Sequence, residues 1–198
     1  MATPGLAPRQ KKARRLRACL AFIDESGFLM APLLRRTWAP RGKTPILLQR
    51  GRSHKKVSAI AALVLSPKYR RIRLFFRLHP NVAINALYLR DFLAQLCRHL
   101  PGKYIIVWDR LNAHRSNLLK QYLRKRRRIS FEFFPPYAPE LNPVEYIWSY
   151  LKTSSMANRA ELELTDLTTT THHNVRRLQY QPRLLKAFLN HSSLFSLI

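Results

Sequence analysis

Three prolines between a short aromatic run and a helix constrain this chain more tightly than any other feature of its sequence. Residues 130–134, S-F-E-F-F, predict a β-strand. The prolines within residues 135–139 exclude regular structure and predict a stiff, extended loop. Asn142 and Pro143 then have the residue types typical of a helix N-cap and of the first helical position. Glu145 therefore lies in the first turn of a helix, at the mouth of the loop.

Glu145 has two interpretations. Its spacing from Asn142 is that of a capping box, in which the glutamate carboxylate bonds back to the N-cap amide. Alternatively, it is one of several acidic residues that meet at a functional site. Two more acidic residues, Asp24 and Asp109, directly follow apolar runs elsewhere in the chain, and they favour the second interpretation.

The composition indicates a basic globular protein. The chain has 198 residues, 46% of them hydrophobic, which is enough for one domain with a proper core. Lysine and arginine number 36 against 10 acidic residues, giving a net charge of +26. This excess is far beyond what solubility needs, so we expect a polyanionic partner, and nucleic acid in particular. The alternative is a generically basic protein, such as a ribosomal one.

Cysteine use and hydropathy favour the cytoplasm. Cys19 and Cys97 form neither a CxxC pair nor a disulfide framework, so a reducing compartment is expected. Residues 1–23 superficially resemble a signal peptide, but Arg17 interrupts the apolar run and Asp24 ends it without a cleavage site. No apolar run approaches the ~20 residues that span a membrane. We therefore expect a cytoplasmic protein with no membrane partner.

The order of the expected elements indicates an α/β domain. The segments that predict strands are residues 18–23, 33–38, 57–65, 72–78, 104–108 and 130–134. The segments that predict helices are residues 81–100, 117–128, 162–178 and 183–194, together with the helix that begins at Pro143. Ser26 and Gly27 are interpreted as a turn after the first strand. Antiparallel strands come first and later strands enter through helices, so we expect a mixed sheet covered by helices.

Asp24 and Asp109 are expected to meet at one edge of this sheet. Each ends an apolar strand, and the carboxyl ends of parallel neighbours emerge at the same edge, where open α/β sheets bind ligands. Glu145 reaches this edge from the helix that follows the next strand and loop. Glu25 is the alternative to Asp24, but neighbours in a strand point to opposite faces, so only one of them joins the site. We prefer Asp24 because Asp109 likewise follows its apolar run directly.

Three carboxylates around one point need a counter-charge, because like charges raise one another's pKa unless a cation neutralises them. Oxygen-only ligands favour magnesium or manganese. Two such ions ~3.5–4 Å apart activate the attacking oxygen and stabilise the leaving oxygen of a phosphodiester. The surrounding lysines and arginines would hold the nucleic-acid backbone. The sequence thus favours metal-dependent phosphoryl transfer on DNA or RNA.

Histidines add less to this interpretation. His114 is a possible further ligand, but a hydrogen-bonding loop residue is the more ordinary interpretation. His172 and His173 fit a solvated helix surface better than a metal site.

Four motifs carry a family resemblance. They are F-I-D-E-S-G at residues 22–27, R-T-W-A-P-R-G at 36–42, V-W-D-R-L-N-A-H-R-S at 107–116 and P-P-Y-A-P-E-L-N-P-V-E-Y-I-W at 135–148. Together they resemble the D-D-E transposases of the mariner-like superfamily, in particular the bacterial insertion-sequence six-thirty type. Thirty-five residues lie between the second aspartate and the glutamate, which suits the spacing in that family.

The resemblance implies an RNase H-like fold, with a mixed five-stranded sheet of order 3-2-1-4-5 flanked by helices. It implies that Asp24, Asp109 and Glu145 are the catalytic residues and hold two Mg²⁺ or Mn²⁺ ions. It also implies cleavage of DNA at transposon ends by water, followed by attack of the freed 3′-hydroxyl on target DNA, usually at a TA dinucleotide. DNA is then the main partner, a homodimer the expected active form, and the bacterial nucleoid the expected location.

Composition and the resemblance together divide the chain into three expected parts. We expect residues 1–17 to be a disordered basic arm, residues 18–160 to be the catalytic domain, and residues 161–198 to be a helical extension packed on that domain. Only 17 residues precede the first expected strand, too few for the helix-turn-helix region that full-length members carry. We therefore expect a catalytic domain alone, with a separately encoded helix-turn-helix protein as a candidate partner.

Four polar residues near the carboxylates are expected to contact DNA, namely Arg110, Asn112, His114 and Lys152. Arg110 stands where family members often carry Asn or Gly. Lys152 lies two helical turns after Glu145, where a cation would hold the phosphate next to the scissile bond. The alternative for Lys152 is a solvated lysine that favours the helix dipole.

Two other functions remain open at the level of sequence. A remnant of a transposase would bind DNA without cleaving it, or compete for transposon ends. A general RNase H-like nuclease or resolvase would share the carboxylates, although the proline-rich glutamate motif argues against it.

Overall fold

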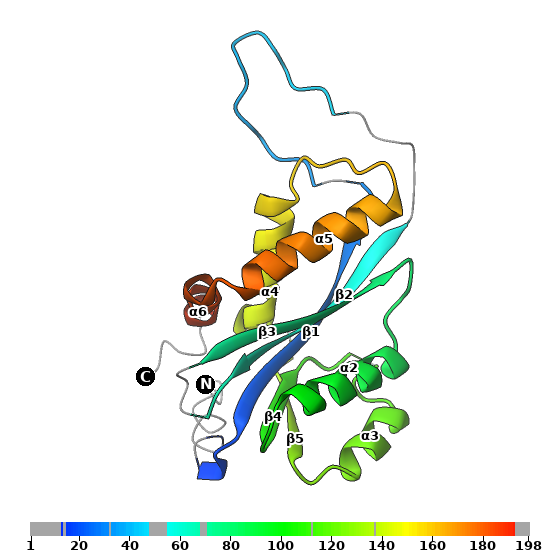
Figure 1. The fold of residues 1–198 in the computed structure, drawn as a ribbon, viewed down its shortest axis with the longest axis vertical. Helices are drawn as coiled ribbons and strands as arrows, with labels where there is room; N and C mark the ends of the chain where they lie inside the picture. The colour runs from blue at the N-terminus through cyan, green and yellow to red at the C-terminus, as the bar shows by residue number, and fades with distance from the viewer. Residues whose placement is uncertain are drawn as a thin grey trace.

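The computed structural model describes residues 13, 15–31, 33–47, 55–67, 71–111, 113–136 and 138–192. These residues form a five-stranded sheet in the order β3-β2-β1-β4-β5, with helices on both faces (Figure 1). The strands are β1 (Cys19–Leu29), β2 (Lys56–Leu65), β3 (Ile72–Pro80), β4 (Tyr104–Trp108) and β5 (Ile129–Phe133). The predicted α/β class and strand order are confirmed, and the fold is RNase H-like.

The sheet is mixed in the way that the element order predicts. β1, β2 and β3 form an antiparallel meander, whereas β4 is parallel to β1 and β5 is parallel to β4. The helix α2 (Ala86–His99) leads from β3 into β4, and α3 (Asn117–Arg124) crosses from β4 to β5. Parallel strands need such crossovers, because a tight hairpin can join only antiparallel neighbours.

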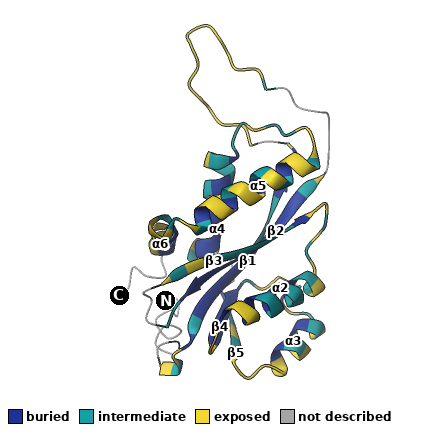
Figure 2. Cartoon of the chain, viewed as in Figure 1, coloured by how far each residue is buried: buried dark blue, intermediate teal, exposed yellow. Residues whose placement is uncertain are grey.

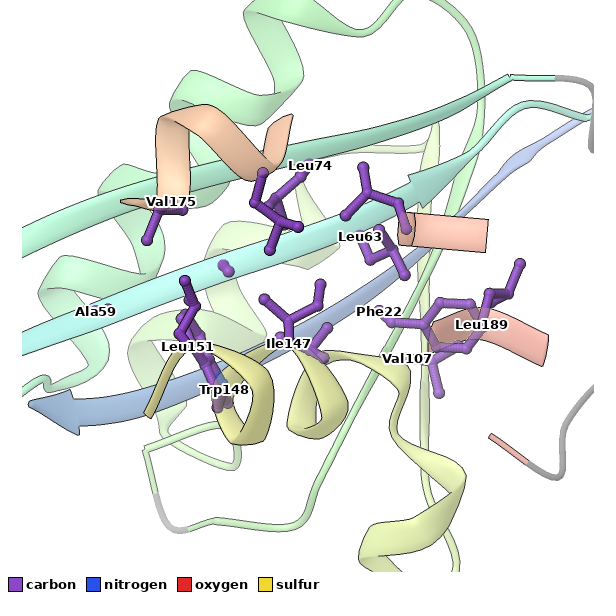
Figure 3. Close-up of a cluster of buried hydrophobic side chains, with 14 of the residues drawn as sticks. Phe22, Ala59, Leu63, Leu74, Val107, Ile147, Trp148, Leu151, Val175 and Leu189 are labelled. Atoms are coloured by element: carbon purple, nitrogen blue, oxygen red, sulfur yellow. The ribbon is translucent and has the colours of Figure 1, made fainter. Parts of the chain in front are cut away.

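Side chains alternate between two cores on opposite faces of the sheet. Along β1, Leu20 and Phe22 enter one core, and Ala21 and Ile23 enter the other. We call the first the α4 core, because α4 (Pro143–Tyr150) covers it together with α5 (Leu164–Gln179) and α6 (Pro182–His191). The second is the α2–α3 core. Figure 3 shows the α4 core, where Trp148 of α4 packs with other apolar side chains against β1 and β2.

β1 is longer than its sequence predicts. Ser26 and Gly27, which predict a turn, lie inside the strand, where they pair with Ala59 and Ser58 of β2. The long antiparallel partner satisfies backbone groups that a turn would otherwise have to satisfy locally. Asp24 consequently lies in the middle of β1 and not at its end.

The prediction of a strand at residues 33–38 is wrong. Residues 33–46 are exposed and contain no helix or strand, and Figure 2 shows them as a projecting arm beyond α5. The side-chain amide of Asn158 holds the base of the arm, accepting from the Arg35 amide at 2.7 Å and donating to the Arg35 carbonyl at 2.8 Å. Trp38 in the arm is fully exposed.

One helix begins later than predicted, and another forms although its sequence has weak helix propensity. α2 begins at Ala86, later than predicted, because Asn85 caps it and accepts from the amides of Leu87 and Tyr88. α5 forms despite its run of threonines, since Leu167 and Val175 are buried in the α4 core. Burial of an apolar face outweighs weak helix propensity here.

The ends of the chain can be described in part. Residues 1–12 and 14 of the predicted basic arm lie outside the described residues, while Ala13 is buried in the α4 core. Leu185 and Leu189 of α6 are buried in the same core as α5, so the C-terminal helices share it with the sheet. Among the described helices, none combines the length and the apolar character that a membrane crossing requires.

Candidate functional site

β1 and β4 bring Asp24 and Asp109 to the same face and level of the sheet. The parallel pairing of the two strands ends at Phe22 with Val107, and each aspartate lies two residues further along. Phe22 and Val107 both enter the α4 core. A step of two residues keeps a side chain on the same face, so both aspartates emerge beside α4. The two aspartates therefore lie near each other as expected, even though β1 continues beyond Asp24.

α4 brings Glu145 to this place. Asn142 caps the helix by accepting from the Val144 amide at 3.2 Å, and Pro143 occupies the first helical position. The Asn142 amide, which a capping box would give to Glu145, instead donates to the Pro139 carbonyl at 2.9 Å. The capping-box interpretation of Glu145 therefore does not hold.

The three carboxylates line one pocket of about 390 Å³. The proline-rich loop and its neighbours form the rest of the lining, which consists of Arg110, Leu111, Phe134, Pro135, Pro136, Ala138, Pro139 and Asn142. The loop closes into a short 3₁₀ turn, η1 (Pro139–Leu141), directly before α4. Because proline fixes its own backbone and restricts the residue before it, this wall of the pocket is stiff.

Asp24 is the most deeply buried of the three carboxylates. Its side chain is held by Trp148, whose indole Nε1–H donates to Asp24 Oδ2 at 3.0 Å, and the aspartate is only 5% exposed. Burial raises the pKa of Asp24 well above its usual range, and the nearby charges of Glu145, Glu25 and Asp109 raise the pKa further. The Trp148 hydrogen bond acts in the opposite direction and favours the ionised form.

The other two carboxylates are more open. Burial raises the pKa of Glu145, the charge of Lys152 lowers it, and the charge of Asp109 raises it again. For Asp109, burial raises the pKa, but hydrogen bonds from His114 and from the Leu111 amide outweigh burial and lower the pKa overall. The pocket therefore holds carboxylates with different affinities for a proton.

His114 connects Asp109 to Glu25, whose side chain points to the other side of the sheet. Its Nδ1 lies 2.6 Å from Asp109 Oδ1, and its Nε2 lies 2.9 Å from Glu25 Oε1. Burial lowers the pKa of His114, but the hydrogen bonds and charges of Asp109 and Glu25 outweigh it and raise the pKa to about 10. Both ring nitrogens face carboxylates, so the doubly protonated imidazolium satisfies both contacts.

Glu25 does not join the pocket. It follows Asp24 in β1 and so points to the α2–α3 side of the sheet, as strand alternation predicts. There it bonds to His114, and its second oxygen, Oε2, is buried without a hydrogen-bond partner among the described residues. The preference for Asp24 over Glu25 agrees with this geometry.

The pocket has the donor chemistry of a site for hard divalent cations. Its ionisable lining consists of three carboxylates and Arg110, and oxygen-only ligands suit magnesium or manganese. In the described part of the chain, no three acidic, histidine or cysteine side chains are close enough together to hold one ion by themselves. The three carboxylates line the same pocket without forming such a group.

The residues expected to contact DNA lie in different surroundings. Arg110 is exposed at the pocket, with its guanidinium carbon 5.9 Å from the centre of the Phe133 ring. Lys152 lies in the π-helical turn η2 (Leu151–Ser155), near enough to Glu145 to lower its pKa, and its Nζ is 5.8 Å from the Phe28 ring centre. Asn112 lies outside the described residues.

His114 is not placed to contact DNA, which corrects our expectation. It is only 2% exposed, and both of its ring nitrogens bond to carboxylates. His172 and His173 are exposed on α5, in agreement with a solvated helix surface.

Two functional contacts escape inspection of the sequence. The bond between Trp148 and Asp24 joins residues 124 positions apart, and the bond between His114 and Glu25 joins residues 89 positions apart. Trp148 is recognisable from the helical pattern as a core residue, but its indole N–H gives no sequence signal. For Glu25, strand alternation gives the correct face but not the partner.

Comparison with known proteins is consistent with this geometry. A family profile described as DDE superfamily endonuclease matches residues 19–168, well over half of the chain. Protein y4pE/y4sA of Sinorhizobium fredii (strain NBRC 101917 / NGR234), described as uncharacterised, is 39% identical over 83 residues, which cover 41% of this chain and 58% of that protein.

Solved structures share the fold at low sequence identity. A Mos1 mariner paired-end complex with Mn has a TM-score of 0.60 and 14% identity, covering 99% of this chain and 63% of that one. A Mos1 transposase paired-end complex with the left transposon end has a TM-score of 0.58 and 15% identity, covering 98% of this chain and 66% of that one. The chain spans less than two thirds of the length of each of these relatives.

Proposed function

This chain belongs to the DDE superfamily endonuclease family, and from that membership we propose that it is the catalytic domain of a transposase that cleaves and joins DNA with two Mg²⁺ or Mn²⁺ ions. The observation that carries the proposal is the single pocket lined by Asp24, Asp109 and Glu145 in a chain of net charge +26. The Mos1 transposase, which has a similar fold, was solved with transposon-end DNA and with Mn.

The three carboxylates would hold the ions in this proposal. Bound ions would supply activation of an attacking oxygen and stabilisation of the leaving oxygen of a phosphodiester. Trp148 fixes one oxygen of Asp24 and favours the ionised carboxylate, in opposition to the burial that raises its pKa, while Oδ1 has no hydrogen-bond partner in the described part of the chain. Asp109 likewise has one oxygen engaged and one without a partner. Its Oδ1 accepts a hydrogen bond from the Leu111 amide and contacts His114 Nδ1, whereas Oδ2 has no partner within the described residues.

Cations beside the pocket would bind the DNA backbone. Arg110 is exposed on the pocket wall, and Lys152 lies close enough to Glu145 to influence its charge. Phosphate contacts of this kind position DNA without reading its sequence. The proline-rich loop forms a stiff part of the pocket wall, so the reacting phosphate would enter a site whose shape changes little.

The test is nicking of plasmid DNA by the purified chain in Mg²⁺ or Mn²⁺. The parent should nick in either metal and be inactive in EDTA. Asp109→Asn should abolish nicking while DNA binding stays intact or becomes tighter, because a negative charge is removed. If Asp109→Asn cuts as well as the parent, the assignment of this pocket is wrong. If the parent binds DNA but never cuts it, the chain is a DNA-binding remnant.

A further inference from the structure

Asp109 lies in a loop beyond the last residue of β4 that pairs with β1. The β1–β4 ladder ends at Phe22 with Val107, so no strand pairing fixes the position of Asp109 relative to β1. Asp24 is fixed independently, because β1 continues and pairs with β2 at Ala61. The spacing of the two aspartates therefore depends on a contact other than the ladder.

His114 makes such a contact. From the loop after β4, its Nδ1 lies 2.6 Å from Asp109 Oδ1 and 3.2 Å from the backbone carbonyl oxygen of Asp109, and its Nε2 lies 2.9 Å from Oε1 of Glu25 in β1. Glu25 is the residue directly after Asp24. The imidazole thus connects the strand that carries one aspartate to the loop that carries the other.

The imidazole is itself held in place. It is 2% exposed and stacks on Trp108, with the ring centres 4.6 Å apart and the planes within 4° of parallel. Trp108 is fully buried in the α2–α3 core and pairs with Phe133 of β5. A side chain clamped by stacking and by two hydrogen bonds has little freedom to rotate.

On this geometry, and resting on the proposed function, we propose that His114 is a positioning residue that fixes the Asp109 carboxylate for metal binding by anchoring it to Glu25 on the opposite face of the sheet. It occupies one oxygen of Asp109 and leaves Oδ2 unpaired within the described residues. Trp148 does the same for Asp24 from α4. Residues that orient metal ligands in this way typically contribute 10- to 100-fold, roughly, to metal affinity or activity.

The experiment is calorimetric titration of Mn²⁺ into the whole chain, without DNA, together with urea unfolding of each variant. His114→Gln keeps a donor near the Nε2 position and loses the one to Asp109, so Mn²⁺ affinity should fall by about 10- to 100-fold. His114→Asn keeps a donor near the Nδ1 position and should lose less. Glu25→Ala removes the anchor without touching the pocket, and it should also weaken Mn²⁺ binding.

His79 provides the matched control. It is another buried histidine that packs on an aromatic ring, with its centre 4.5 Å from that of Tyr88, but it lies on β3 and does not line the pocket. His79→Asn should lower stability and leave Mn²⁺ affinity unchanged.

Three outcomes separate the claims. Folded His114→Gln and Glu25→Ala proteins that bind Mn²⁺ as tightly as the parent would overturn the positioning role and leave the proposed function intact. If His114→Gln does not fold, Glu25→Ala decides alone by the same criterion. A parent that binds no Mn²⁺ and cuts no DNA would remove the proposed function, and the positioning role with it.

Discussion

Asp24 is a deeply buried carboxylate. Its ionised form lowers the stability of the metal-free fold, although the proposed metal site needs that form. It is 5% exposed and lies near the charges of Glu145, Glu25 and Asp109. Its pKa in the folded protein is raised, whereas in the unfolded chain a free aspartate titrates at about 3.9. The folded state therefore binds the proton more tightly than the unfolded state, and ionisation of Asp24 destabilises the metal-free fold.

This argument gives a prediction about pH. For the parent in EDTA, the free energy of unfolding should fall as pH rises from about 4 through the raised pKa of Asp24, because the unfolded chain ionises first. Asp24→Asn should lack this loss, so the variant should melt at a higher temperature than the parent at pH 8 and at a similar one at pH 4. Thermal unfolding across this pH range measures the difference.

Magnesium should reverse the order of these melting temperatures. The parent should be stabilised by Mg²⁺, since a ligand that binds only the folded state raises its stability, while Asp24→Asn should respond little. A metal-free parent that is as stable as Asp24→Asn at pH 8 would show that burial of this charge carries no cost.

Among the elements, α4 contributes most to the site, because its first turn carries Glu145 and its buried face carries Trp148. Asn142 caps it through the Val144 amide. Asn142→Ala should lower the free energy of unfolding by about 0.5–2 kcal/mol, because that amide loses its partner. Asn142→Ser is the matched control and should retain most of the stability, since serine caps helices about as well as asparagine. Urea unfolding of both variants checks this prediction. An Asn142→Ala protein as stable as Asn142→Ser and the parent would contradict the capping role.

Elements whose signals are local could be predicted from the sequence. β4 runs from Tyr104 to Trp108 as predicted, and α4 begins at Pro143. Prediction failed where tertiary contacts outweigh local signals: β2 extends β1 through Ser26 and Gly27. The apolar residues near Leu33 resemble a strand but have no sheet neighbour, so they form an exposed arm. Strand pairing depends on distant partners, which periodicity along the chain does not contain.

The site divides in the same way. That the three carboxylates line one pocket was expected from local signals, namely an aspartate after each of two apolar runs and a glutamate in a capped first turn, although Asp24 lies in the middle of β1 and not at its end. The contacts that hold them were not, since Trp148 and His114 reach partners on β1 that are far away in the sequence. His114 was expected to contact DNA and is instead buried beneath the site.

At the scale of the whole molecule, the net charge of +26 should dominate DNA binding. Binding should be strong and nearly indifferent to sequence, with log affinity falling against log salt at a slope of about −0.9 for each phosphate neutralised. A competition titration against random DNA checks this. Marked preference for one short sequence at moderate salt would contradict it.

Lys152 tests the same idea at one position. Lys152→Ala should reduce the magnitude of the salt slope by about one unit, because one phosphate contact is lost. Lys152→Met is the control that keeps most of the apolar stem, and it should lose the same unit if charge is the cause. Lys152→Arg should retain it. An unchanged slope in Lys152→Ala would leave Lys152 with a role in the packing of η2 only.

The most direct test of the account is the Mg²⁺-dependent rate of DNA nicking by a matched pair of glutamate variants. Glu145 lines the pocket, whereas Glu140 lies five residues earlier, exposed in η1 and absent from the pocket lining. Each change to glutamine removes one negative charge from the same stretch of chain. We expect Glu145→Gln to lose nicking while retaining its fold and its DNA binding, and Glu140→Gln to nick at the parent's rate. Nicking by Glu145→Gln at the parent's rate would contradict the claim that these three carboxylates perform the chemistry.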